Sequence, residues 1–302
     1  MKDNHKIAAP EPGIYEGVPF IEYLAWEAQS NSGFSGIERS LLHYRHHPPI
    51  DETPQMRFGT LCHAGRLEPA AVFRNYVVMP DLTHGITTKD GKASKSPKAT
   101  AEYAERVERW ESENAPGKII VSQAELDAMI GVVAALDANE VAHKWFTAHG
   151  PNEVSIVWQD SDTGVLCKGR LDKLALSLGI VVDLKTTRDC LWFHKQIAER
   201  RYYRQAALYV DGVATLTGEV CRFGIVAVEN VQPFGVMAAP LSEDAVDLGR
   251  EEYKAALRQI AEARRTNVWP GYDNPDEWTL PAWKESSSEP LELIIGGEKV
   301  AL

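Results

Sequence analysis

Residues 179–187 read Gly-Ile-Val-Val-Asp-Leu-Lys-Thr-Thr, which is typical of a buried strand. Its second half carries Asp183 and Lys185. Side chains two residues apart on a strand point to the same face, so these two groups are expected to face one site. A second acid, Asp172, lies upstream, and the residues between the acids can form a hairpin that turns at residues 177–179. If the turn centres between residues 177 and 178, the two acids lie directly opposite each other, with Cβ atoms about 5 Å apart. The sequence therefore predicts two carboxylates and one ammonium group close together.

This trio of Asp172, Asp183 and Lys185 favours a metal-assisted reaction. Two carboxylates at such a distance raise the pKa of one of them strongly unless a cation lies between them. Mg²⁺ prefers oxygen ligands and takes one or two carboxylates while it keeps several waters. A lysine beside such an ion can orient or deprotonate a bound water, or stabilise charge on a phosphoryl oxygen. The pattern indicates phosphodiester hydrolysis, whereas the same residues exposed at a strand end would form a surface ion pair worth about 0–1 kcal/mol.

The whole chain is expected to be a soluble α/β protein of one large domain or two small ones. It has 302 residues, of which 44% are hydrophobic, which is enough for a sizeable core. No apolar stretch has the length of a signal peptide or a membrane span, so we expect a cytoplasmic protein without a membrane partner. The cysteines lack a Cys-x-x-Cys spacing, which argues against zinc ribbons, iron–sulfur clusters and a disulfide scaffold. They are Cys62, Cys167, Cys190 and Cys221.

The net charge of −11 counts against a nucleic-acid partner, because phosphate binding leaves a basic footprint. The local balance differs directly after the predicted site. Residues 185–204 contain only two acids, Asp189 and Glu199, against a larger set of cations: Lys185, Arg188, Lys195, Arg200, Arg201 and Arg204. This basic segment suits a phosphate backbone, and a solvated helix face is the alternative interpretation.

Periodicity and punctuation place these residues in an ordered series of elements. Helical character begins at residue 35 and stops at His47-Pro48-Pro49. The further helices are expected at residues 56–67, 101–112, 123–146, 192–210 and 243–266, the third of them with a possible break. The strands are expected at residues 153–159, 165–176, 180–185, 222–229 and 234–239. This order predicts helices, an antiparallel meander, a crossover helix and further strands, which is an α/β fold on a mixed sheet.

Other polar residues fall where they can reach the predicted site. Glu153 opens the first strand, where it is either a third carboxylate of the site or an ordinary strand-edge charge. His63 lies on the helix at residues 56–67, and a lone histidine is more often a partly buried side chain than a ligand. On the crossover helix Arg201, Gln205 and Tyr209 are spaced by four and share one stripe. Such a stripe can hold a nucleic-acid backbone and a base or sugar.

Taken in order, these residues resemble a known family. The matching segments are residues 58–69, 153–158, 164–173, 183–187 and 203–212. They are similar to the RecB-like branch of the PD-(D/E)XK nuclease superfamily, and more closely to the nuclease domain of the phage and prophage exonuclease VIII (RecE) family. The resemblance extends over residues 35–283. It leaves residues 1–34 as an irregular N-terminal arm and 284–302 as a C-terminal tail, with a mobile basic loop at 83–98.

The resemblance implies a restriction-endonuclease-like core and a Mg²⁺-dependent exonuclease, in which Mn²⁺ substitutes for Mg²⁺. This enzyme would degrade linear double-stranded DNA from its ends, 5′ to 3′, and leave 3′ single strands for a RecT-type annealing protein. It would act as a homo-oligomeric ring in the cytoplasm of a bacterial host.

The resemblance also implies a role for each candidate residue. His63, Asp172 and Asp183 become metal ligands, with the Leu184 carbonyl as a further one. Lys185 becomes the group that positions or activates the attacking water, and Glu153 an accessory acid. The DNA contacts are then assigned to Gln205, Tyr209, Arg201, Arg204 and Arg188.

Two departures from the family pattern are visible. Leu171 stands where the superfamily name has proline, and no cysteine set matches the iron–sulfur staple of some RecB-like nucleases. Neither departure removes a catalytic group. The alternatives are a structure-selective or endonucleolytic DNase of the same superfamily and a non-catalytic DNA-binding subunit that keeps the fold. A glycosidase that uses Asp172 and Asp183 as its carboxyl pair would leave Lys185 unexplained.

Overall fold

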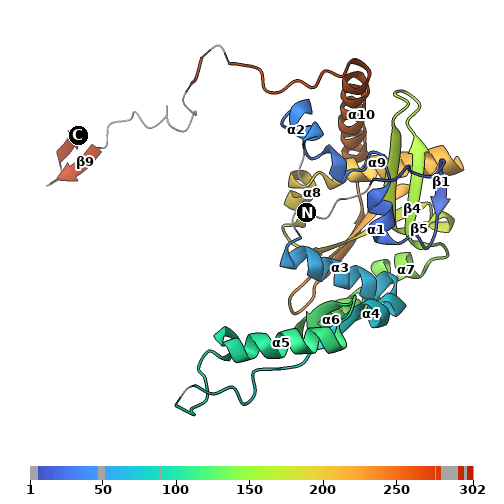
Figure 1. The fold of residues 1–302 in the computed structure, drawn as a ribbon. Coiled ribbons are helices and arrows are strands. Elements are labelled where there is room, and N and C mark those ends of the chain that lie inside the picture. The colour runs from blue at the N-terminus through green and yellow to red at the C-terminus, as the bar shows by residue number, and fades with distance from the viewer. Residues whose placement is uncertain are drawn as a thin grey trace.

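The computed structural model shows a mixed sheet of six strands in the order β1-β4-β5-β6-β7-β8, flanked by helices (Figure 1). The residues that it describes are 6–46, 52–88, 90–275, 277–279, 292–295 and 298–301. The six strands are β1 (Gly13–Tyr15), β4 (Asn152–Gln159), β5 (Leu166–Ala175), β6 (Ile180–Thr187), β7 (Arg222–Glu229) and β8 (Val236–Pro240). Only β6 and β7 pair in parallel, and the other neighbours are antiparallel. The predicted α/β fold on a mixed sheet is thus confirmed.

Two helical layers cover the sheet, and β7 carries buried apolar side chains on both of its faces. One face carries α9 (Tyr202–Thr217) and α10 (Glu243–Thr266), which pack on Val154, Ile156 and Val181. The opposite face carries α3 (Pro54–Leu67), α6 (Gln123–Ala138) and α7 (Glu140–Thr147). These helices enclose Val182 and Leu184. Strand β6 therefore contributes alternate residues to two separate cores, as a buried central strand should.

The helix boundaries follow capping signals in the sequence. Thr53 caps α3 through the backbone N–H of Met56, and Pro54 occupies the first turn. Ser122 and Glu125 form a capping box at the start of α6. The other helices are α1 (Phe20–Ala25), α2 (Leu41–Arg45), α4 (Pro69–Asn75), α5 (Ala101–Asn114) and α8 (Phe193–Glu199), with 3-10 turns η1 (Ser32–Phe34), η2 (Pro97–Ala99) and η3 (Leu176–Leu178).

The crossover that was expected as one helix over residues 192–210 is two helices, α8 and α9. The chain breaks between them at Arg201, which adopts the left-handed conformation with φ of 51°. Arg200 and Arg201 close the end of α8 through backbone bonds to Gln196 and Ala198. A non-glycine residue in this conformation is uncommon, so the propensity of the sequence does not predict the break.

The expectation of an irregular arm over residues 1–34 is wrong for the part that the structure describes. Strand β1 pairs with β4 at the edge of the sheet, with Ile14 opposite Ile156. Tyr23, Trp26 and Phe34 are buried. The segment is held by Lys168 on β5, whose ammonium group donates hydrogen bonds to the carbonyls of Tyr23 at 2.7 Å and Trp26 at 2.8 Å.

A smaller unit that the sequence analysis missed lies beside α6, away from the central sheet (Figure 1). Strands β2 (Tyr76–Met79) and β3 (Ile119–Ser122) pair in parallel, and α5 lies in the connection between them. The expected loop at 83–98 contains an isolated bridge between Thr87 and Ala93, and its mobility stays a prediction.

The expected C-terminal tail includes two strands that pair antiparallel, β9 (Glu292–Ile295) and β10 (Glu298–Ala301), while the rest of 284–302 lies outside the described residues. No helix in the described part of the chain is long and apolar enough to cross a membrane.

Candidate functional site

The candidate site forms where strands β5 and β6 separate. Their ladder runs from Ala175 opposite Ile180 to Lys173 opposite Val182 and stops there. Strand β6 continues beside β7 up to Thr187 opposite Glu229. One edge of β6 is thus released from β5 directly after Val182, and the next residues on the two strands are Asp172 and Asp183.

The hairpin between these acids turns where the sequence analysis placed it. The turn consists of η3 and Gly179, which has a left-handed φ of 59° that glycine adopts without strain. The next positions along this register would place Asp172 opposite Asp183, but the ladder ends one residue earlier. Instead of a ladder bond, the Asp172 carboxylate accepts the backbone N–H of Leu184 at 2.6 Å. The side chain therefore fills the gap that opens between the strands.

Three acid–base pairs line this gap. Glu153 accepts from Arg170 Nε at 2.7 Å, and Asp172 contacts His63 Nε2 at 3.1 Å. Lys185 Nζ lies 2.5 Å from Asp183 Oδ2. Each acid belongs to a different neighbouring strand, β4, β5 or β6, and each is largely buried. The cluster is neutral as a whole because each carboxylate has its own cation.

His63 is oriented from behind by its own helix. Its Nδ1 lies 2.8 Å from the Gly59 carbonyl oxygen one turn earlier on α3, so Nδ1–H donates there and Nε2 faces Asp172. Burial disfavours the charged ring, but the Asp172 carboxylate and the hydrogen bonds outweigh burial and raise the pKa of His63 to about 9. A backbone bond at one ring nitrogen that leaves the other directed at a carboxylate is the arrangement that positions histidine ligands.

The pKa values of the two neighbouring aspartates, Asp172 and Asp183, are shifted in opposite directions. Burial opposes ionisation of both. For Asp172, the His63 ring, Lys185 and the Leu184 N–H overcome burial and lower the pKa. For Asp183, burial and the Asp172 charge outweigh Lys185 and raise the pKa. Burial alone would lower the pKa of Lys185, but Asp183 and Asp172 raise it, so Lys185 is an ammonium ion here.

Two side chains of α9 contact the acid and the lysine of β6. Gln205 on α9 donates from Nε2 to Asp183 Oδ1 at 2.7 Å. Tyr202, at the start of α9, lies beneath Lys185 with 4.8 Å between Nζ and the ring centroid. Both contacts fix the direction of the two β6 side chains.

Three of the residues predicted to contact DNA interact with other parts of the chain itself. Arg201 pairs with Glu38 at 2.9 Å and Glu252 at 2.8 Å. Arg204 is buried and also pairs with Glu38 at 2.9 Å. Tyr209 is 8% exposed and packs against Gly169, where a Cβ atom would lie 2.9 Å from its ring. Intramolecular carboxylates thus neutralise Arg201 and Arg204, and packing against β5 covers Tyr209, so contact of these three residues with DNA stays a prediction.

Arg188 is exposed directly after β6, as a phosphate-binding side chain would have to be. Two residues of the cluster were not predicted. Arg170 stands two residues before Asp172 on β5 and so lies on the same face of the strand. This spacing is the signal from which it could have been predicted. Tyr202 gave no signal, because its contact with Lys185 depends on the break between α8 and α9.

The donor set suits a hard divalent cation, although the side chains are paired with one another. Asp183 Oδ2 is buried and accepts no hydrogen bond of normal geometry, despite its contact with Lys185. Two carboxylates, one of which includes this unsatisfied oxygen, and an imidazole are the right ligand types for Mg²⁺ or Mn²⁺. Within the described residues no group of three His, Cys, Asp or Glu side chains is close enough to hold a metal. A bound ion would therefore have to replace existing partners, His63 from Asp172 or Lys185 from Asp183.

A family model described as "PDDEXK-like domain of unknown function (DUF3799)" matches residues 37–276. The chain belongs to this family. Membership confirms the predicted relationship to the PD-(D/E)XK superfamily, and the closer resemblance to the RecE family stays a prediction.

Two solved structures were compared with this PDDEXK-like domain. The crystal structure of a "Putative exonuclease" from Eubacterium rectale has a TM-score of 0.53 at 12% identity, covering 87% of this chain and 94% of that one. At this identity the likeness shows the fold. A protein called SSO0001 has 18% identity, coverage of 57% of this chain and 73% of that one, and a TM-score of 0.27, which carries no argument. No curated protein sequence matches the chain.

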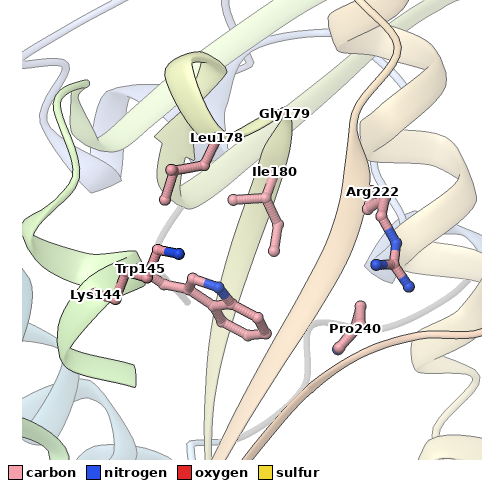
Figure 2. Close-up of a pocket in the computed structure, with 7 residues that line it drawn as sticks. All are labelled: Lys144, Trp145, Leu178, Gly179, Ile180, Arg222 and Pro240. Carbon is pink, nitrogen blue, oxygen red and sulfur yellow. The ribbon is translucent and has the colours of Figure 1, made fainter. Parts of the chain in front are cut away.

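A pocket of about 170 Å³ in the PDDEXK-like domain lies apart from the acids (Figure 2). Figure 2 shows the Trp145 ring beside Ile180, with Arg222 and Pro240 across from it. Ile180 and Arg222 begin β6 and β7, so the pocket is at the opposite end of these strands from Lys185. None of its lining residues is an acid, so the pocket is separate from the carboxylate cluster.

Proposed function

We propose that this PDDEXK-like domain is a Mg²⁺-dependent exodeoxyribonuclease that degrades linear double-stranded DNA 5′ to 3′ and leaves 3′ single strands. The observation that carries the proposal is the placement of Asp172, Asp183 and Lys185 in the gap between β5 and β6. Acids and an ammonium ion at such a position are needed for phosphodiester hydrolysis and add little to a purely structural sheet. Exonucleolytic action and its 5′ to 3′ direction rest on the RecE resemblance.

The metal of this proposal would be held by Asp172, Asp183 and the Nε2 atom of His63, with the Leu184 carbonyl as the further ligand. When bound, such an ion polarises the phosphoryl group and makes a nucleophilic water available at neutral pH. Mn²⁺ is expected to replace Mg²⁺, because it accepts the same oxygen and nitrogen ligands.

The side chains of the chain itself have separable tasks in this reaction. Lys185 Nζ, held as an ammonium by Asp183 and seated over Tyr202, is suited to orient the attacking water and to stabilise negative charge on the phosphoryl oxygen. Its raised pKa makes a role as proton acceptor the weaker one. Gln205 fixes the Asp183 carboxylate by its hydrogen bond, and Glu153 acts as an accessory acid held by Arg170.

The oligomeric state, the partner protein and the cellular location in this proposal are supported by the resemblance alone. We include in the proposal a homo-oligomeric ring that encloses the duplex and a single-strand annealing partner of the RecT type. We also include action in the cytoplasm of a bacterial cell as a phage or prophage product. A ring with its acidic surface outward would reconcile the net charge of −11 with a DNA substrate.

Digestion of labelled DNA tests the proposal. Linear duplex carrying a 5′ or a 3′ label, in separate reactions, should lose the 5′ label first in the presence of Mg²⁺, and covalently closed circular duplex should stay intact. Chelation of the metal should stop the reaction. Cleavage of the circles would instead indicate the endonuclease, and duplex binding without hydrolysis under any divalent metal would indicate the non-catalytic subunit.

A further inference from the structure

The segment that follows strand β6 displays two large apolar side chains to solvent. Leu191 is 69% exposed and Trp192 is 51% exposed. Buried residues anchor the segment on both sides of them, since Cys190 and Phe193 are each 6% exposed. Large apolar side chains exposed together beside a charged cluster are typical of a surface that binds a partner.

Hydrogen bonds hold this segment in place. The Cys190 N–H donates to Glu229 Oε1 on β7 at 3.1 Å, and the Cys190 thiol donates to the Ala227 carbonyl at 3.5 Å. Gln196 on α8 donates from Nε2 to Thr187 Oγ1, the last residue of β6, at 2.7 Å. The two apolar side chains therefore stand on a base that is fixed to the sheet at both ends.

Aromatic contacts connect this base to the acid cluster. The Phe193 ring stacks on Tyr202 with centroids 6.0 Å apart and an interplanar angle of 25°. The same Tyr202 ring carries Lys185 Nζ at 4.8 Å on its surface. Trp192 is therefore next in sequence to Phe193, and only the Tyr202 ring lies between Phe193 and Lys185.

The charges around Trp192 suit a polyanion. Lys195 Nζ lies 4.2 Å from the centroid of the Trp192 ring, and Arg188 is exposed at the start of the segment. Neither cation forms an ion pair within the described residues. The acid of the segment, Asp189, uses Oδ1 to accept the Leu191 N–H at 2.8 Å. Exposed aromatic rings interleaved with unpaired cations are what single nucleic-acid strands bind, with bases on the rings and phosphates on the cations.

We propose that Leu191 and Trp192 form a stacking platform for the terminal nucleobase of the strand held at Asp183 and Lys185. Arg188 and Lys195 contact the phosphates next to that base. This inference rests on the proposed function, because it needs a DNA end at the site, and it adds a binding subsite for an unpaired base. The platform would keep the end of one DNA strand apart from its complement while Asp183 and Lys185 act on the phosphodiester backbone of that strand.

Fluorescence of a terminal 2-aminopurine tests the platform directly. The base is placed unpaired at the 5′ or the 3′ end of a duplex, in separate samples, and mixed with the Lys185→Ala protein in Mg²⁺ so that binding is observed without cleavage. We expect the fluorescence to be quenched on binding. Adding Trp192→Ala should restore the fluorescence and weaken binding about tenfold, whereas Trp192→Phe should keep most of the quenching.

Trp278→Ala is the matched control, since Trp278 is 93% exposed in the segment after α10. It should leave quenching and affinity unchanged, and melting temperatures should agree among all variants because neither ring is buried. Equal quenching and affinity with Trp192→Ala and the control would overturn the platform while leaving the nuclease proposal standing. Failure of the wild-type protein to bind or cut any duplex would overturn both.

Discussion

At the scale of single residues, the arrangement of the cluster is one acid per strand and one cation per acid. Asp172, Asp183 and Lys185 follow from the sequence because strand alternation and the hairpin turn fix where they point, whereas the role of His63 was indicated only by the family resemblance. Arg201 shows the limit of such reasoning. Helix spacing gives a stripe of side chains, but only the folded chain brings Glu38 from a distant segment to neutralise the arginine.

The pair of Glu153 and Arg170 gives a prediction about stability. Their side chains are 15% and 11% exposed, so Arg170→Ala leaves a largely buried carboxylate without its cation. We expect a loss of roughly 3 kcal/mol in the free energy of unfolding, measured by urea denaturation. Adding Glu153→Gln should recover part of the loss, because a neutral amide needs no counter-ion. Losses that simply add in the double variant would contradict a direct interaction.

Gln205 gives a prediction about activity. Gln205→Leu keeps the approximate size but removes the donor to Asp183 Oδ1, which lies 2.7 Å away. We expect kcat on linear duplex to fall about tenfold or more with little change in the affinity for DNA, since a hydrogen bond to a charged group contributes roughly 1.5–3 kcal/mol. Gln196→Leu on the neighbouring helix, which bonds to Thr187, is the control and should retain more activity. An unchanged kcat in Gln205→Leu would remove the positioning role.

At the scale of elements, long and strongly patterned segments were predictable and short ones were not. The bounds of β7 and α10 agree with the sequence analysis, because both have a clear period and a cap or turn at each end. Strands β1, β2 and β3 were missed. Each has four residues or fewer and is defined by a partner that lies far away in the sequence, such as β4 for β1.

The crossing of α9 and α10 gives a prediction for the element that carries Gln205. Gly249 on α10 lies so close to α9 that a Cβ atom would be 2.2 Å from the backbone carbonyl oxygen of Tyr203. Backbone cannot move aside as a side chain can, so Gly249→Ala should destabilise the fold by roughly 1–3 kcal/mol despite the better helix propensity of alanine. Glu251→Ala, on an exposed position of the same helix, should change stability by about 0.5 kcal/mol or less. Equal stability of the two variants in urea would show that the helices can separate freely.

At the scale of the whole molecule, charge and the N-terminal segment need the fold to be understood. A net charge of −11 looks unfavourable for a DNA partner in the sequence, and Lys168 is a charged residue that the fold buries. In the structure Lys168 is the anchor that joins residues 23–26 to the sheet by three hydrogen bonds to carbonyls. The basic segment 185–204 is likewise divided, with Arg201 and Arg204 neutralised and Arg188 and Lys195 left at the surface near the site.

This division predicts how DNA binding depends on salt. Because few cations near the site are unpaired, the slope of log affinity against log salt concentration should be shallow, and Arg188→Ala should reduce its magnitude by about 1. Arg222→Ala, at the pocket on the opposite end of the strands, is the control and should leave the slope unchanged. Fluorescence anisotropy of a labelled duplex across a salt series measures both. An equal effect of the two variants would mean that DNA does not approach the site along Arg188.

The most direct test of the central claim is the rate of Mg²⁺-dependent hydrolysis of linear duplex by Lys185→Ala and by Asp183→Asn. The control is Lys254→Ala, which removes a surface lysine that contacts Asp162 at 3.4 Å. The account predicts that wild-type protein and Lys254→Ala release nucleotides at equal rates, while the two site variants lose at least a hundredfold in rate and stay folded by circular dichroism. Hydrolysis at the wild-type rate by either site variant would contradict the account.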